Sequence, residues 1–130
     1  RLHLGWAGDR QWQAPLDRAN RGVSAIREVP ALQRMFDDLG VRPTYVVDHP
    51  VAATHESAAI MAAVAAGGNA EIGAHLHPWV TPPDDEPVTP FNSYAGNLAA
   101  ALERAKLECL VATIEKEIGR RPVTYKAGRY

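Results

Sequence analysis

The sequence contains little cysteine, no excess of charge of one sign and no long hydrophobic run. Its one cysteine, Cys109, cannot form an internal disulfide, which favours a reducing compartment such as the cytoplasm. The 14 basic and 15 acidic residues include no basic block, so nucleic acid and anionic membrane surfaces are not expected as partners. No apolar run approaches the length of a membrane span, so we expect no membrane-spanning segment.

A length of 130 residues suits one domain with its own core and is short for two. The chain opens at Arg1 rather than at a methionine and stops at Tyr130, directly after a strand-like segment. We therefore expect residues 1–130 to be a single, incomplete domain.

Regular elements are expected to alternate along most of the chain. Apolar residues at helical spacing, favourable first-turn residues and terminal glycines predict helices over residues 30–39, 56–66 and 98–118, with Thr54 as the cap of the second. Residues rich in β-branched and aromatic side chains predict strands over 44–47, over 71–75 and from 124 onward. Such alternation predicts parallel strands joined by helices, hence an α/β sheet or barrel.

Two connections carry proline and so cannot be regular helix or central strand. Pro50 ends the strand at 44–47, with Asp48 and His49 in the turn before it. The segment 76–96 contains five prolines, which indicates a long ordered loop of the kind that often binds ligands.

The carboxyl ends of parallel strands are where α/β proteins place their sites. Applied to the expected strands, this rule selects a short set of side chains, namely Asp48 and His49, His75 and His77, and Lys126 and Arg129.

The pair His75 and His77 has the residue type and the spacing of metal ligands. Neutral imidazole is a common zinc ligand, and residues two apart in an extended chain point the same way. Gly73 and Ala74 before the pair leave space around it, while Trp79 and the proline-rich loop follow.

Three stretches taken together resemble the polysaccharide deacetylases of the NodB-homology class. They are GVRPTYVVDHPVA at 40–52, EIGAHLHPW at 71–79 and TYKAGRY at 124–130. The resemblance implies a distorted (β/α) barrel that removes acetyl groups from an N-acetylated carbohydrate with a divalent metal, most often zinc. It makes His75 and His77 metal ligands and places Lys126 and Arg129 in the motif that lines the substrate groove.

This chain departs from the family pattern in two places. The family spaces its histidines four apart rather than two, and it carries an aspartate pair on its first strand. Before Trp12 the only carboxylate is Asp9, which by resemblance is the candidate catalytic base. The family's general acid comes from a later strand, beyond Tyr130.

Asp48 after the first expected strand and Trp79 in the proline-rich loop keep two interpretations each. Asp48 either caps the turn before Pro50 or contacts substrate, and Trp79 either packs the loop onto the barrel rim or stacks on a sugar ring.

Two other functions remain open. The chain could be a non-catalytic carbohydrate-binding or structural relative of the same fold, which the sparse acidic residues at the amino end favour. An amidohydrolase-type metal-dependent hydrolase also uses a His-x-His pair, although in that fold the pair belongs to the first barrel strand.

Overall fold

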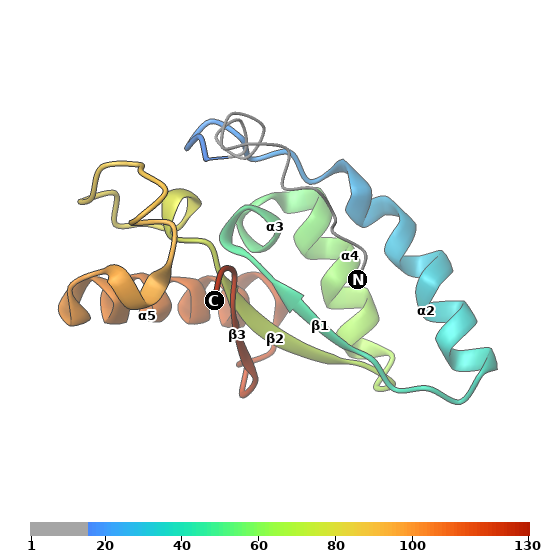
Figure 1. Cartoon of the computed structure of the whole chain (residues 1–130). Coiled ribbons are helices and arrows are strands. Elements are labelled where there is room, and N and C mark those ends of the chain that lie inside the picture. Colours follow the sequence, from blue (N-terminus) through green and yellow to red (C-terminus); the bar gives the residue numbers. More distant parts are fainter. Residues whose placement is uncertain (1–15) are drawn as a thin grey trace, which may run out of the picture.

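The computed structural model describes residues 16–130, in which three parallel strands alternate with helices (Figure 1). The strands are β1 (Thr44–Val47), β2 (Glu71–Leu76) and β3 (Tyr125–Ala127). The helices are α2 (Val29–Asp38), α3 (His49–Ala53), α4 (His55–Ala66) and α5 (Ala100–Ile118), with short 3-10 turns η1 (Ser24–Glu28), η2 (Pro78–Val80) and η3 (Ala95–Asn97). The expected α/β class with parallel strands is confirmed.

The sheet has the order β1-β2-β3, so β2 pairs with a parallel strand on each side. Val47 lies opposite Ala74, and His75 lies opposite Lys126. Within residues 16–130 these three strands form an open sheet rather than a closed barrel. The register brings the carboxyl ends of all three strands to one edge, as expected.

Helix α2 begins and ends close to the expected residues, for the expected reasons. Pro30 occupies its first turn, where no amide hydrogen is needed. Gly40 then adopts a left-handed conformation with φ of 65°, which lets the chain turn toward β1.

The turn expected around Pro50 is instead the beginning of a short helix, α3. Asp48 is its N-cap, since its carboxylate accepts a hydrogen bond from the Val51 amide at 3.1 Å. Proline suits the first turn of a helix as well as it suits a turn, and this prediction overlooked that possibility. Thr54 precedes α4 as expected, but its side chain makes no capping hydrogen bond.

The core lies between the sheet and helices α3, α4 and α5. Leu110, Ile114 and Ile118 on α5 are buried, as their spacing predicts, and they pack with Met61 of α4 and Ile72 and Leu76 of β2. Lys106, four residues before Leu110, is also fully buried, which the sequence analysis did not anticipate.

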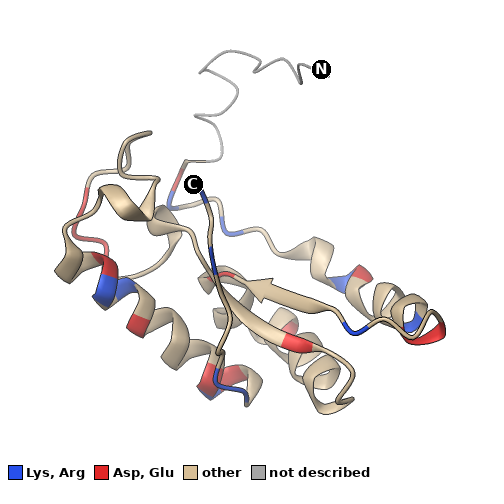
Figure 2. Cartoon of the chain, turned by 60° about the horizontal axis from the view of Figure 1, so that its bottom comes forward, with Lys and Arg blue, Asp and Glu red and all other residues tan. Residues whose placement is uncertain are grey.

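Charged residues of both signs are scattered along α2 and α5 (Figure 2). No helix among residues 16–130 is long and apolar enough to cross a membrane.

Candidate functional site

The candidate site lies at the carboxyl edge of the sheet. Asp48 directly follows β1, His75 and His77 lie at the end of β2, and Lys126 lies in β3 opposite His75. The structure therefore brings these side chains from three separate stretches of sequence to the same edge. Asp9 falls outside the described residues, so its expected role as a base rests on the sequence alone.

The rings of His75 and His77 lie side by side. Their centroids are 4.5 Å apart and their planes meet at 65°. Leu76 between them is fully buried and points to the opposite face of the strand, as the alternation of strand side chains requires. The two imidazoles are thus close enough to approach one small ion together.

One nitrogen of His75 is held by the backbone. Its Nδ1 lies 3.0 Å from the carbonyl oxygen of Lys126, which can only accept a hydrogen bond, so a neutral His75 donates from Nδ1 and carries its lone pair on Nε2. Burial lowers the pKa of His75, and the positive charge of Lys126 lowers it further. The hydrogen bond to the Lys126 carbonyl and the negative charge of Asp48 raise this pKa, but each by less than burial lowers it. A metal-binding histidine commonly has its second nitrogen held by a carbonyl in this way.

The ring of His77 is held by packing. It lies between the His75 ring and the Trp79 ring, whose centroid is 4.6 Å away at an interplanar angle of 75°. Burial lowers the pKa of His77, and the nearby charges of His75 and Lys126 lower it further, while Asp48 opposes them. Both imidazoles are therefore favoured in the neutral form that binds metal.

Gly128 makes room for His77. A Cβ at this position would lie 2.7 Å from the carbonyl oxygen of Leu76 and 3.0 Å from Cδ2 of the His77 ring. The Gly128 amide also donates to that carbonyl at 3.0 Å, so backbone and ring approach each other closely here. Gly128 was not among the residues selected from the sequence, although a glycine between Lys126 and Arg129 at a strand end is a signal for such a close approach.

Asp48 is near the histidines but is already engaged. Its Oδ1 caps α3, and its negative charge acts on the pKa of both His75 and His77. Residues 16–130 contain no group of three or more His, Cys, Asp or Glu side chains arranged to hold a metal ion. Among the described residues, the candidate metal ligands at this edge are therefore the two imidazoles alone.

His49 does not join this pair. The described residues offer no hydrogen-bond partner to its buried Nδ1, and burial lowers its pKa. His49 lines a separate open pocket of about 370 Å³ whose other lining residues include Cys109 and Thr113 of α5.

The two basic residues of the expected groove differ in their contacts. Lys126 is exposed, with its ammonium 5.2 Å from the centre of the Tyr130 ring. Arg129 lies over the Tyr94 ring at 4.7 Å and donates to the Ser93 hydroxyl at 2.8 Å. Arg129 thus ties the proline-rich loop to the end of β3, whereas Lys126 remains available at the rim.

Trp79 is buried, with 8% of its surface exposed, and its ring contacts that of His77. Of its two interpretations, this burial favours packing of the loop onto the rim over stacking on a sugar.

Comparisons of the chain with protein-family models, with curated proteins and with solved structures found no match.

Proposed function

We propose that this chain carries the metal-binding part of a metal-dependent hydrolase that removes acetyl groups from an N-acetylated carbohydrate. The observation that carries the proposal is the pair of adjacent imidazoles at the carboxyl edge of a parallel sheet, one with its Nδ1 held by a backbone carbonyl. The proposal adds that the open three-stranded sheet is part of a (β/α) barrel of the polysaccharide deacetylase type. The resemblance of the three strand-end motifs supports both statements.

His75 and His77 would hold the divalent metal, most often zinc in that family. Bound there, the metal would supply an activated water and polarise the acetyl carbonyl. Burial keeps both imidazoles neutral, so their lone pairs are available near neutral pH.

The other residues would bind and orient the substrate. The exposed ammonium of Lys126 would attract the negative charge that develops on the carbonyl oxygen during attack. Asp48 has one carboxylate oxygen on the Val51 amide, which leaves the other to accept a hydrogen bond from a sugar hydroxyl. Arg129 would act indirectly, by fixing the loop that borders the groove.

Metal binding is the first test. Zn²⁺ is titrated into the wild-type protein and into His75→Ala and His77→Ala, with His55→Ala as the control because His55 is an exposed histidine on α4. We expect one bound zinc in the wild-type and control proteins and a large loss of affinity in the two site variants. Equal zinc binding by all four proteins would exclude His75 and His77 as the ligands.

Acetate release from chitin oligosaccharides then separates an enzyme from a non-catalytic carbohydrate-binding relative. The use of Asp48 as a helix cap favours this second candidate, because it engages the carboxylate whose charge acts on both histidines. Zinc and sugar binding without acetate release would establish it, in a protein that also includes the later strand expected to supply the general acid. The amidohydrolase alternative is less favoured, since β1 precedes the strand that carries the histidines.

A further inference from the structure

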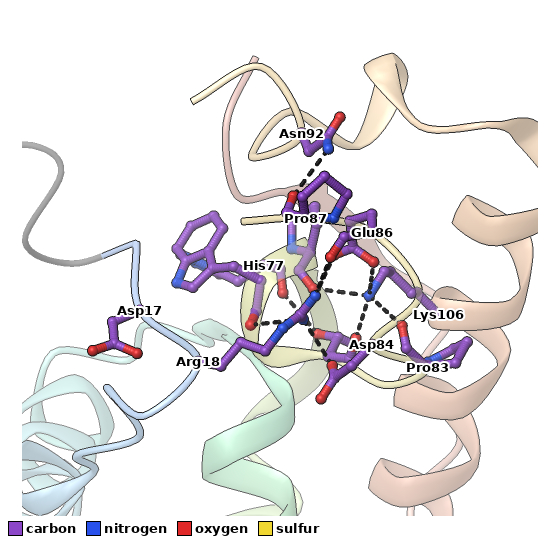
Figure 3. A network of polar contacts seen from close by, with 12 residues as sticks. Asp17, Arg18, His77, Pro83, Asp84, Glu86, Pro87, Asn92 and Lys106 are labelled. Carbon is purple, nitrogen blue, oxygen red and sulfur yellow. Dashed lines mark hydrogen bonds and ion pairs between the residues drawn. The ribbon is translucent and has the colours of Figure 1, made fainter. Parts of the chain in front are cut away.

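The loop that follows His77 is held by two buried or half-buried cations. Figure 3 shows Lys106 of α5 and Arg18 reaching it from different sides, with Glu86 between them. Neither cation belongs to the candidate site, and neither was selected from the sequence. Their contacts all fall on the segment 78–86, which begins directly after the second histidine.

Lys106 sits in a cage of backbone oxygens. Its ammonium donates to the carbonyl oxygens of Pro78 at 3.0 Å, Thr81 at 2.6 Å and Pro83 at 2.6 Å. A lysine ammonium has three hydrogens, and these three bonds use all of them. The side chain is 0% exposed, and its bonds to Pro78 and Thr81 are buried, while the bond to Pro83 is partly buried.

Glu86 supplies the opposite charge. Its Oε2 lies 3.0 Å from the Lys106 ammonium, and its Oε1 lies 3.7 Å from the Arg18 guanidinium. Both Glu86 oxygens are buried, and their interactions are ion pairs rather than well-aligned hydrogen bonds. A buried ammonium without this carboxylate would carry an uncompensated charge.

Arg18 holds the outer side of the same loop. It donates to the Trp79 carbonyl at 3.3 Å and to the Asp84 carboxylate at 2.8 Å, and it also donates to the Glu86 carbonyl. Together the two cations take the carbonyl oxygens of five residues in the segment, which are Pro78, Trp79, Thr81, Pro83 and Glu86.

The contacts of Lys106 and Arg18 act on His77 through Pro78 and Trp79, the two residues that follow it. Lys106 holds the carbonyl of Pro78, Arg18 holds the carbonyl of Trp79, and the Trp79 ring forms one wall against the His77 ring. The His77 ring itself makes no hydrogen bond to any described residue, so its orientation depends on those walls. A displaced loop would therefore release the ring.

We propose that Lys106, with Glu86 as its counter-ion, is a positioning residue for His77. It acts by fixing the loop that carries Trp79, and it touches neither metal nor substrate. The expected effect on metal affinity rests on the proposed function, whereas the effect on the contact between His77 and Trp79 does not. A lysine that only stabilises the fold would leave that contact unchanged.

The first experiment examines the metal-free protein. Lys106→Ala removes the atoms that n-propylammonium can restore, three carbons and a charged nitrogen. By NMR at fixed pH, we expect the His77 ring-proton shifts and their nuclear Overhauser contacts to Trp79 to change in the variant. Addition of n-propylammonium should return them toward wild type, and 1-propanol, which lacks the charge, should not.

Unchanged His77 signals in a folded Lys106→Ala protein would overturn the proposal. If this variant fails to fold, Glu86→Gln replaces it, because the amide keeps the shape of the carboxylate and removes only its charge. The same displacement of the His77 signals is then expected, and its absence has the same meaning. Lys116→Ala is the matched control, since Lys116 lies on the same helix with its side chain 80% exposed.

The second experiment measures Zn²⁺ affinity by calorimetry. We expect Lys106→Ala to bind zinc about 10- to 100-fold more weakly, the range found when groups that support a metal ligand are removed. The affinity should recover with n-propylammonium, and Lys116→Ala should match wild type. Equal affinity in a less stable Lys106→Ala protein would reduce Lys106 to a structural role and overturn the proposal.

The two experiments separate the two proposals. A wild-type protein that binds no zinc would remove the proposed function, while the NMR comparison would still decide whether Lys106 positions His77.

Discussion

The two polar regions that flank Trp79 are built in opposite ways. The histidine pair is half-buried, burial favours its neutral form, and among the described residues its rings make one hydrogen bond, from His75 to the Lys126 carbonyl. The Lys106 cage is buried and charged, with every ammonium hydrogen bonded. Charge-assisted bonds in a dry interior are strong and directional, so they suit a fixed support. Imidazole nitrogens that make no hydrogen bond to the described residues suit a site that binds a ligand.

The largest effect is expected at the support. Lys106→Met should lower the free energy of unfolding by about 3–5 kcal/mol, because it leaves the buried Glu86 carboxylate with only the more distant Arg18 guanidinium, at 3.7 Å, as an ion-pair partner. Urea denaturation measures this loss. Lys116→Met should stay within about 0.5 kcal/mol of wild type, since its side chain is exposed. Similar losses in the two variants would mean that the buried contacts of Lys106 add no more to stability than those of an exposed lysine.

Removal of both charges sharpens the same comparison. The double variant Lys106→Met with Glu86→Leu leaves no buried ion, so it should be more stable than Lys106→Met alone. A double variant less stable than the single one would show that the loop carbonyls, and not the carboxylate, dominate the loss.

At the histidine pair, space matters more than charge. Gly128→Ala should cost about 1–3 kcal/mol, since its new methyl group would meet the Leu76 carbonyl oxygen at 2.7 Å and the His77 ring at 3.0 Å. It should also weaken zinc binding. Gly96→Ala is the control, because a Cβ there meets nothing within 4 Å. Thermal denaturation and zinc titration of the two variants give the answer.

A smaller effect is expected at Asp48. Asp48→Ala removes the cap of α3 and should cost about 1 kcal/mol, whereas Asp48→Asn keeps a capping oxygen and should cost less. Denaturation curves for both variants would test this order. If the two variants lose equal stability, the charge of Asp48 matters more than its hydrogen bond to Val51.

The smallest effect concerns pH. Burial lowers the pKa of His49, His75 and His77 in the folded protein below the ordinary value of 6.5. The unfolded chain therefore binds more protons between the two values, so stability should fall as pH drops below about 6.5 and level off below the folded pKa. His49→Phe should reduce this dependence, and His55→Phe, at an exposed position, is its control. Urea denaturation at several pH values measures the slope, and identical slopes in wild type and His49→Phe would contradict the assignment.

Local patterns predicted most of the regular elements. Helical spacing and terminal glycines placed α2 and the end of α5 within a residue or two, because these signals act over a few positions. The short helix α3 was missed, since Asp48, His49 and Pro50 suit a turn and a helix start equally well. Only the residues that pack after Pro50 decide between them.

Lys106 shows why the support behind the candidate site could not be predicted from the sequence. It continues the four-residue spacing of Leu110, Ile114 and Ile118, but a lysine is ordinarily expected in water. Its burial depends on carbonyl groups 23 to 28 residues earlier in the chain. No local pattern reports such a distant partner.

The sequence by itself determined the alternation of helices and strands and the pairing of histidines at a strand end, because periodicity and turn chemistry are local properties. The tertiary structure alone decided that the Lys126 carbonyl holds His75, that Gly128 admits the His77 ring and that Lys106 is buried among loop carbonyls. Each of these depends on close approach between distant segments, where excluded volume and the loss of water set the energy.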